Sequence, residues 1–143
     1  MNKIAPLSTA MLLVAAAAAA QAGDLAVTVE HVQTGDGQVL VGLFDSASSF
    51  PKQTVRGQAV SAQQRDADGK LRVVFPGIAP GSYAVSAVHD LDGNGKLNTN
   101  AMGIPTEPYG FSGKPAGRMG PPQFGDAAID VPAAGTNISI ELR

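Results

Sequence analysis

The feature that most constrains the fold is an alternation of apolar and polar residues that recurs in short segments along the chain. Leu25, Val27 and Val29 point to one face, and Thr28 and Glu30 to the other, which is the period of a half-buried strand. Turn residues separate such segments about every 8–12 positions, and none of the segments has a helical period. The pattern predicts an all-β fold, a single antiparallel β-sandwich of about seven strands.

Seven segments are expected to form these strands. The second, QVLVGLF, is apolar on both faces and is predicted to lie inside a sheet, and the turn sequence TGDG before it predicts a hairpin of the first two strands. The expected strands are residues 24–32, 38–44, 58–64, 70–75, 82–89, 127–131 and 137–142. The residues expected to be buried between two sheets are Leu25, Val27, Val29, Val41, Val73, Phe75, Val85, Ile138 and Ile140.

Residues 1–22 have the pattern of a secretory signal peptide. Lys3 precedes an apolar run that contains MLLVAAAAAA, and the segment ends in AQA, the small-x-small motif that signal peptidase cleaves. The run is shorter than the about 20 residues that a membrane-spanning helix needs. We therefore expect cleavage before Gly23 and a periplasmic or secreted protein with one mature domain, residues 23–143.

The composition of the mature chain excludes several classes of function. Without residues 1–22 the chain has nine Lys and Arg against twelve Asp and Glu, a net charge of −3, and no basic cluster, so nucleic-acid binding is not expected. No second apolar stretch is long enough for a transmembrane anchor. The chain has no cysteine, so packing must stabilise it, with a bound ion as a further source of stability.

A long segment, residues 90–126, breaks the strand pattern. Between Gly93 and Gly125 there are eight glycines and five prolines in 33 residues. Such a stretch inside a compact domain is usually functional or disordered. It also contains apolar side chains that can anchor it, so we expect one long, ordered, Gly/Pro-rich loop of the Ω type. The expected anchors are Met102, Ile104, Tyr109, Phe111, Met119 and Phe124.

The start of this loop, HDLDGNGKLNTN (residues 89–100), has oxygen-bearing side chains at alternate positions. This is the spacing of the first half of an EF-hand calcium loop, because Ca²⁺ takes six to eight oxygen ligands. Position 12 is Ala101, which cannot provide the usual bidentate carboxylate, so another acid, Glu107 or Asp126, must close the site. The predicted Ca²⁺ ligands are Asp90, Asp92, Asn94, the Lys96 carbonyl, Asn98 and Glu107.

Two alternatives to a calcium site remain open from the residues alone. An Asx-rich turn can cap itself with hydrogen bonds and hold no metal. A hydrolase centred on His89, Asp90 and Glu107, with Ser112 as nucleophile, is the other. No nucleophile-elbow or metalloprotease motif surrounds these residues, and His89 continues the buried phase of its strand, so we expect a hydrogen-bonded strand-end histidine and no enzyme.

Three blocks of the sequence carry a family resemblance. HDLDGNGKLNTN, GIPTEPYGFSG (residues 103–113) and GPPQFGDAAIDV (residues 120–131) resemble blocks of the exported bacterial family catalogued as domain of unknown function 2141. The resemblance extends from about residue 25 to residue 142. The chain departs from the family pattern at Leu91 and Asp92, where Glu and Asn are common, at Asn98, where Asp is common, and at Gly113, where Asn is common.

The resemblance implies a fold and a compartment, since the family has no established activity. FPGIAPGSYAV (residues 75–85) is also similar to the start of carboxypeptidase-regulatory-like and transthyretin-like sandwiches, which are chiefly accessory or binding modules. We therefore expect an Ig-like or transthyretin-like sandwich that serves as an exported accessory or binding module, with a calcium-stabilised loop and an unknown protein or saccharide partner. The alternative is a metal-free sandwich of the same fold that docks a protein or a saccharide.

Overall fold

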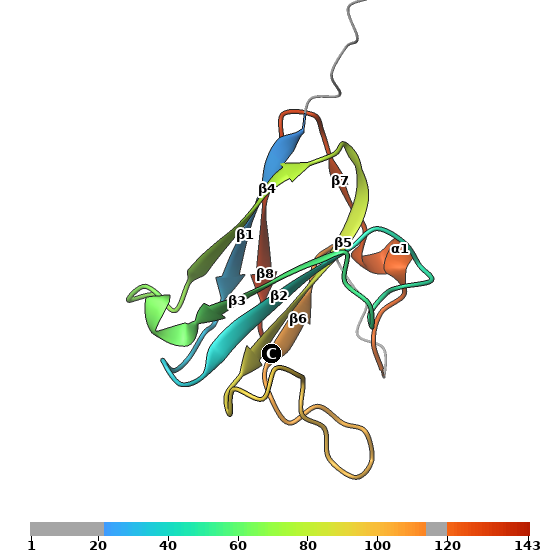
Figure 1. The fold of residues 1–143 in the computed structure, drawn as a ribbon. Coiled ribbons are helices and arrows are strands. Elements are labelled where there is room, and N and C mark those ends of the chain that lie inside the picture. The colour runs from blue at the N-terminus through green and yellow to red at the C-terminus, as the bar shows by residue number, and fades with distance from the viewer. Residues whose placement is uncertain (1–21, 114–119) are drawn as a thin grey trace, which may run out of the picture.

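The computed structural model describes residues 22–113 and 120–143, and within them eight strands form two packed sheets (Figure 1). The predicted signal peptide lies outside the described residues except for Ala22, and the expected anchor Met119 lies outside them as well. No helix in the described part is long and apolar enough to cross a membrane. The strands are β1 Gly23–Glu30, β2 Gln38–Phe44, β3 Arg56–Ser61, β4 Leu71–Ile78, β5 Gly81–Asp90, β6 Tyr109–Phe111, β7 Ile129–Val131 and β8 Thr136–Glu141, and the short helices are η1 Ala62–Gln64 and α1 Phe124–Ala127.

The two sheets have different pairing patterns. The three-stranded sheet has the order β4-β1-β8, with β1 antiparallel to β4 and parallel to β8. The five-stranded sheet is antiparallel throughout, with the order β3-β2-β5-β6, and β7 pairs with the first part of β5. The predicted all-β sandwich is therefore confirmed.

The predicted hairpin of the first two strands is wrong, because β1 and β2 belong to different sheets. The connection between them does not turn back on itself but crosses from one sheet to the other. Val32 in this connection is fully buried, its N–H donates to the Gly69 carbonyl (2.9 Å), and its carbonyl accepts from Arg65 (3.1 Å). A turn sequence specifies a bend, but it does not specify to which sheet the next strand belongs.

The main core lies between the sheets and contains the residues expected there. Eight of the nine predicted core side chains are no more than 2 % exposed, and the exception, Ile138, is half-buried and packs against the cluster. Ile138 is on β8, one of the two edge strands of its sheet. Full burial of a Val, Leu or Phe side chain contributes about 1.5–3 kcal/mol, so these positions dominate the stability.

A second, smaller apolar cluster joins the long loop to the five-stranded sheet. Phe50 lies at its centre, with ring centroids 5.1 Å from Phe44, 5.6 Å from Phe111 and 6.1 Å from Phe124. The expected loop over residues 90–126 is thus interrupted by β6 and by the start of α1. A strand of three residues is too short to show an alternation, so pairing with β5 rather than local sequence creates β6.

The pairing of β5 with β6 determines which residues meet at the start of the loop. Val88 pairs with Tyr109, and in the next step the His89 N–H donates to the Pro108 carbonyl (2.8 Å). One further step in this antiparallel register places Glu107 beside Asp90. Figure 1 shows the loop of residues 91–108 projecting beyond the ends of β5 and β6.

Candidate metal site

Asp90 is the last residue of β5 and has no exposed surface. Its Oδ2 accepts hydrogen bonds from the Gly95 N–H and from Gln38 Nε2, both at 2.8 Å, and its Oδ1 accepts from the Asn94 N–H at 3.1 Å. Gln38 is the residue that faces Asp90 in the pairing of β2 with β5. These hydrogen bonds of the carboxylate therefore hold the first turn of the loop against the sheet.

Glu107 closes the loop from its other end. Its side chain is 6 % exposed, Oε1 accepts from the Leu91 N–H and Oε2 from the Asn98 N–H, both at 2.9 Å. Asp126, the other acid considered for this place, accepts instead from the Gln123 N–H (3.4 Å) in the first turn of α1. Of the two candidates, Glu107 is the one that the structure brings to the loop.

The remaining predicted ligands form a chain of hydrogen bonds along the exposed side of the loop. Asp92 Oδ1 accepts from the Asn94 N–H (3.2 Å), and Asp92 Oδ2 accepts from Asn98 Nδ2 (2.7 Å). Asn94 Oδ1 accepts from the Lys96 N–H (3.1 Å), and Asn94 Nδ2 donates to Asn98 Oδ1. The Lys96 side chain is exposed. Asn94 and Asn98 thus use their side-chain oxygens within the loop.

Three of the predicted ligands form a compact acidic cluster. Asp90, Asp92 and Glu107 each offer one carboxylate oxygen, and these three atoms lie within 4.8 Å of one another. Calcium–oxygen distances of about 2.3–2.6 Å allow two ligands on one ion to be at most about 5 Å apart. Lys70–Glu30 is the one ion pair found in the described part of the chain, so no Lys or Arg there neutralises the cluster. The spacing and the charge are compatible with a bound divalent cation.

The protonation state of Asp90 also suits a cation. Burial raises the pKa of Asp90, but hydrogen bonds from Gln38 Nε2 and from the Gly95 and Asn94 N–H groups outweigh it, and the pKa lies below the ordinary value of 3.8. Asp90 is therefore ionised at neutral pH. A carboxylate has about four lone-pair sites, and three are occupied here, so Oδ1 keeps one site for a metal.

The same hydrogen bonds describe a turn that caps itself. Asp90, Asp92, Asn94 and Asn98 accept from or donate to their own loop, which is the arrangement of Asx turns. A metal would add to this network through the free lone pairs of the three carboxylates. Asn98 would join as a ligand only after rotation of its amide, since its Nδ2 faces Asp92.

Ser112 lies apart from the other residues of the hydrolase hypothesis. His89 is buried, and its Nε2 lies 2.8 Å from the Asp36 carbonyl oxygen, as expected for a hydrogen-bonded strand-end histidine. The Ser112 hydroxyl accepts from the Val85 N–H (2.8 Å) and donates to the Ala127 carbonyl (2.6 Å). Val85 and His89 are four residues apart on β5, about 14 Å along the strand. The structure therefore does not bring Ser112 and His89 together.

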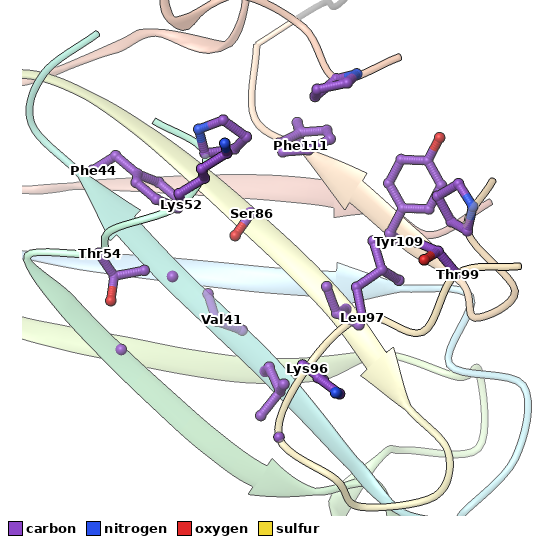
Figure 2. Close-up of a pocket in the computed structure, with 18 of the residues that line it drawn as sticks. Val41, Phe44, Lys52, Thr54, Ser86, Lys96, Leu97, Thr99, Tyr109 and Phe111 are labelled. Atoms are coloured by element: carbon purple, nitrogen blue, oxygen red, sulfur yellow. The ribbon is translucent and has the colours of Figure 1, made fainter. Parts of the chain in front are cut away.

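Sequence reasoning missed two features near the loop. Gln38 is the first, because its contact with Asp90 depends on the pairing of β2 with β5. The second is a groove of about 1130 Å³ on the outer face of the five-stranded sheet, beside the loop (Figure 2). Met102 and Ile104 line it and are 82 % and 52 % exposed. Both were expected to anchor the loop, and this expectation is wrong, because most of each side chain is exposed. Apolar residues at the tip of a polar loop were instead the signal for this groove in the sequence.

Comparison with known proteins gives a family and no closer relative. A family model described as "Uncharacterized protein conserved in bacteria (DUF2141)" matches residues 27–139. No curated protein and no solved structure matches the chain.

Proposed function

Since the chain belongs to the DUF2141 family of uncharacterized bacterial proteins, whose description assigns no activity, we propose a function from the geometry of the loop. The protein is an exported accessory or binding module in which a Ca²⁺ ion stabilises the loop of residues 90–107. The single observation that carries the proposal is the cluster of Asp90, Asp92 and Glu107, whose oxygens lie within 4.8 Å without a basic partner in the described residues. The sequence of residues 1–22 supports export.

The size of the cluster favours Ca²⁺ over Mg²⁺. Magnesium–oxygen distances of about 2.0–2.1 Å limit two ligands on one ion to about 4.2 Å, and Mg²⁺ demands near-ideal octahedral geometry. Oxygen separations of up to 4.8 Å are compatible with the larger cation. Three carboxylates without a bidentate acid at position 12 should give the weak affinity of extracellular modules, roughly 10⁻⁴–10⁻³ M.

The ion would act on the two ends of the loop at once. Asp90 holds the first turn to β2 and β5, and Glu107 holds Leu91 and Asn98. Without a cation, the three negative charges repel one another at short range. A bound Ca²⁺ converts this repulsion into attraction and stabilises the folded state by mass action.

The test is thermal unfolding of the purified protein in EDTA, in Ca²⁺ and in Mg²⁺. At about one hundred times the dissociation constant, Ca²⁺ should add on the order of 2.7 kcal/mol to the free energy of unfolding. Mg²⁺ should add much less. The double variant Asp90→Ala/Asp92→Ala should lose the gain, and Glu107→Gln should reduce it.

The matched control is Asp68→Ala, which removes an exposed carboxylate from a different turn and should leave the calcium effect unchanged. A melting temperature of the wild type that stays constant up to 10 mM Ca²⁺ would defeat the calcium proposal. The loop would then be a self-capped turn.

The groove supports a second candidate, a metal-free module that docks a partner. Its floor is the outer face of a sheet and its wall is the same loop, so docking does not require a metal. If calcium does not change the stability of the protein and a ligand still binds in the groove, this candidate is favoured over the first.

A further inference from the structure

The groove has an apolar floor built from the outward positions of four strands. Leu40 and Gly42 on β2, and Ser86 and Val88 on β5, face it, since Val39, Val41 and Leu43 of β2 point into the core. A Cβ at Gly42 would lie 2.6 Å from Thr54 Cγ2 and 3.1 Å from Ser86 Oγ, so the glycine keeps the floor low. The aromatic side chains of β6, Tyr109 and Phe111, flank it.

The loop forms the wall of the groove on the side of the candidate metal site. Leu97, Met102, Ile104 and Pro105 line the groove, and Met102 and Ile104 expose most of their surface to water. The groove follows β2 from Phe44 to Leu40, about 14 Å at the rise of an antiparallel strand. Its volume of about 1130 Å³ is at the upper end of small-molecule pockets, so a long ligand fits it.

The charges that line the groove all have one sign. Lys52 and Lys96 are its only charged lining residues in the part of the chain that the structure describes, and neither is in an ion pair there. This contrasts with a chain that has more acidic than basic residues. Figure 2 shows Lys52 near Phe44 and Lys96 near Leu97, at opposite ends of the groove.

We propose that this groove binds a monomeric medium-chain fatty acid, with its alkyl chain on the apolar floor and its carboxylate at Lys52. An apolar groove favours an alkyl chain, because burial of each methylene is favourable, and unpaired lysines favour an anion. A neutral saccharide would use neither the lysines nor most of the floor. The length of the groove is roughly that of an extended dodecyl chain.

Lys52 is the better carboxylate partner of the two lysines. Lys96 follows the turn that carries Asp90 and Asp92, and these acids repel a second anion in its neighbourhood. Lys52 lies at the Phe44 end, where the acidic cluster is far along β2. The alkyl chain then runs from Lys52 toward the apolar wall at Met102 and Ile104.

The test is calorimetric titration of the purified protein in EDTA, which keeps calcium soaps from precipitating, with dodecanoate below its micelle concentration. We expect saturable binding at one site and binding of dodecyltrimethylammonium that is at least tenfold weaker, with no binding of acetate. Equal binding of both amphiphiles would mean a merely apolar surface and would overturn the proposal. So would absence of dodecanoate binding, or binding only to phosphatidylcholine vesicles, to an oligosaccharide or to a peptide.

Charge reversals locate the carboxylate. Lys52→Glu should weaken dodecanoate about tenfold, which corresponds to about 1.4 kcal/mol, and Lys96→Glu should weaken it less. Arg72→Glu is the matched control, since Arg72 is an exposed residue of β4 in the other sheet. A loss in Lys52→Glu no larger than that in Arg72→Glu would contradict the proposal.

Changes in the wall locate the alkyl chain. Met102→Ser/Ile104→Ser replaces two exposed side chains, so the fold should survive, and dodecanoate binding should weaken about tenfold. Val55→Ser, at an exposed apolar residue outside the groove, should change nothing. These measurements do not depend on the calcium proposal, because each is made in EDTA, without the ion.

Discussion

Ser112→Ala should destabilise the protein strongly, although the change removes a single oxygen atom. Ser112 is 1 % exposed, and its hydroxyl accepts from the Val85 N–H and donates to the Ala127 carbonyl. It thereby continues the pairing of β6 with β5 and joins this pair to the end of α1. The alanine leaves one buried N–H and one buried C=O without this partner.

The magnitude follows from these two orphaned groups. Each buried polar group left unsatisfied costs about 1–3 kcal/mol, so the free energy of unfolding should fall by about 2–6 kcal/mol. A domain of this size has about 5–15 kcal/mol in total, so the loss is easily measured.

The assay is urea unfolding of the wild type, Ser112→Ala and Ser139→Ala, with melting temperature as a second measure. Ser139 is an exposed serine of β8, and its alanine variant should stay within about 0.5 kcal/mol of the wild type. A Ser112→Ala variant that unfolds like the Ser139→Ala variant would refute the structural role assigned to this hydroxyl.

Three further predictions concern the core, the loop and the leader. Val85→Asp should prevent folding, because an unpaired charge at a fully buried position costs several kcal/mol, and a folded spectrum by circular dichroism would contradict the strand phase. In EDTA, the stability difference between the wild type and Asp90→Asn should be constant above pH 5 and shrink below pH 3.8, because the lowered pKa of Asp90 stabilises the fold only while the carboxylate is ionised. A difference that grows in acid would show the opposite sign. Mass spectrometry of the exported protein should find Gly23 at its N-terminus, and an intact Met1 in that fraction would contradict export.

The strands with the clearest alternation were predictable because their signal is local. In β1 and β5, the period of two places Leu25, Val27 and Val85 on the buried face without knowledge of any partner. The edge of β8 shows the limit of this reasoning. Ile138 and Ile140 have the same phase, but only Ile140 is fully buried, and Ile140 is the one that lies against Gly110 of β6.

Pairing between strands was not predictable from such local signals. A turn between two alternating segments is compatible with a hairpin and with a crossover, and here the second strand belongs to the other sheet. β6 has three residues, one of them Gly110, and exists because β5 offers it a pairing edge. A Cβ on Gly110 would meet the Ile140 side chain at 2.8 Å, so this glycine allows β6 to approach β8.

The first half of the candidate site was predictable, because its signal is local in the sequence, as it is for the alternating strands. Asp90, Asp92 and Asn94 alternate along the chain at the spacing of calcium-loop ligands. In the structure the Asn94 N–H donates to the carboxylates of both Asp90 and Asp92. The choice of Glu107 over Asp126 required the register of β6. His89 bonds to Pro108, so the residue before Pro108 must lie beside the residue after His89.

The loop contacts both proposed ligands, the cation at its ends and the fatty acid at its tip, and this determines how the two ligands can affect each other. Asp90 and Glu107 hold its ends, while Met102 and Ile104 between them stand against the groove. When a bound cation fixes the ends of the loop, the wall residues lose less conformational entropy on packing against an alkyl chain. Linkage then requires that the fatty acid raise the affinity for Ca²⁺ by the same factor as Ca²⁺ raises the affinity for the fatty acid. The carboxylate at Lys52 lies at the far end of the groove from the cation, so direct attraction between the two charges is a minor part of any such coupling, and the order of the wall is the major part.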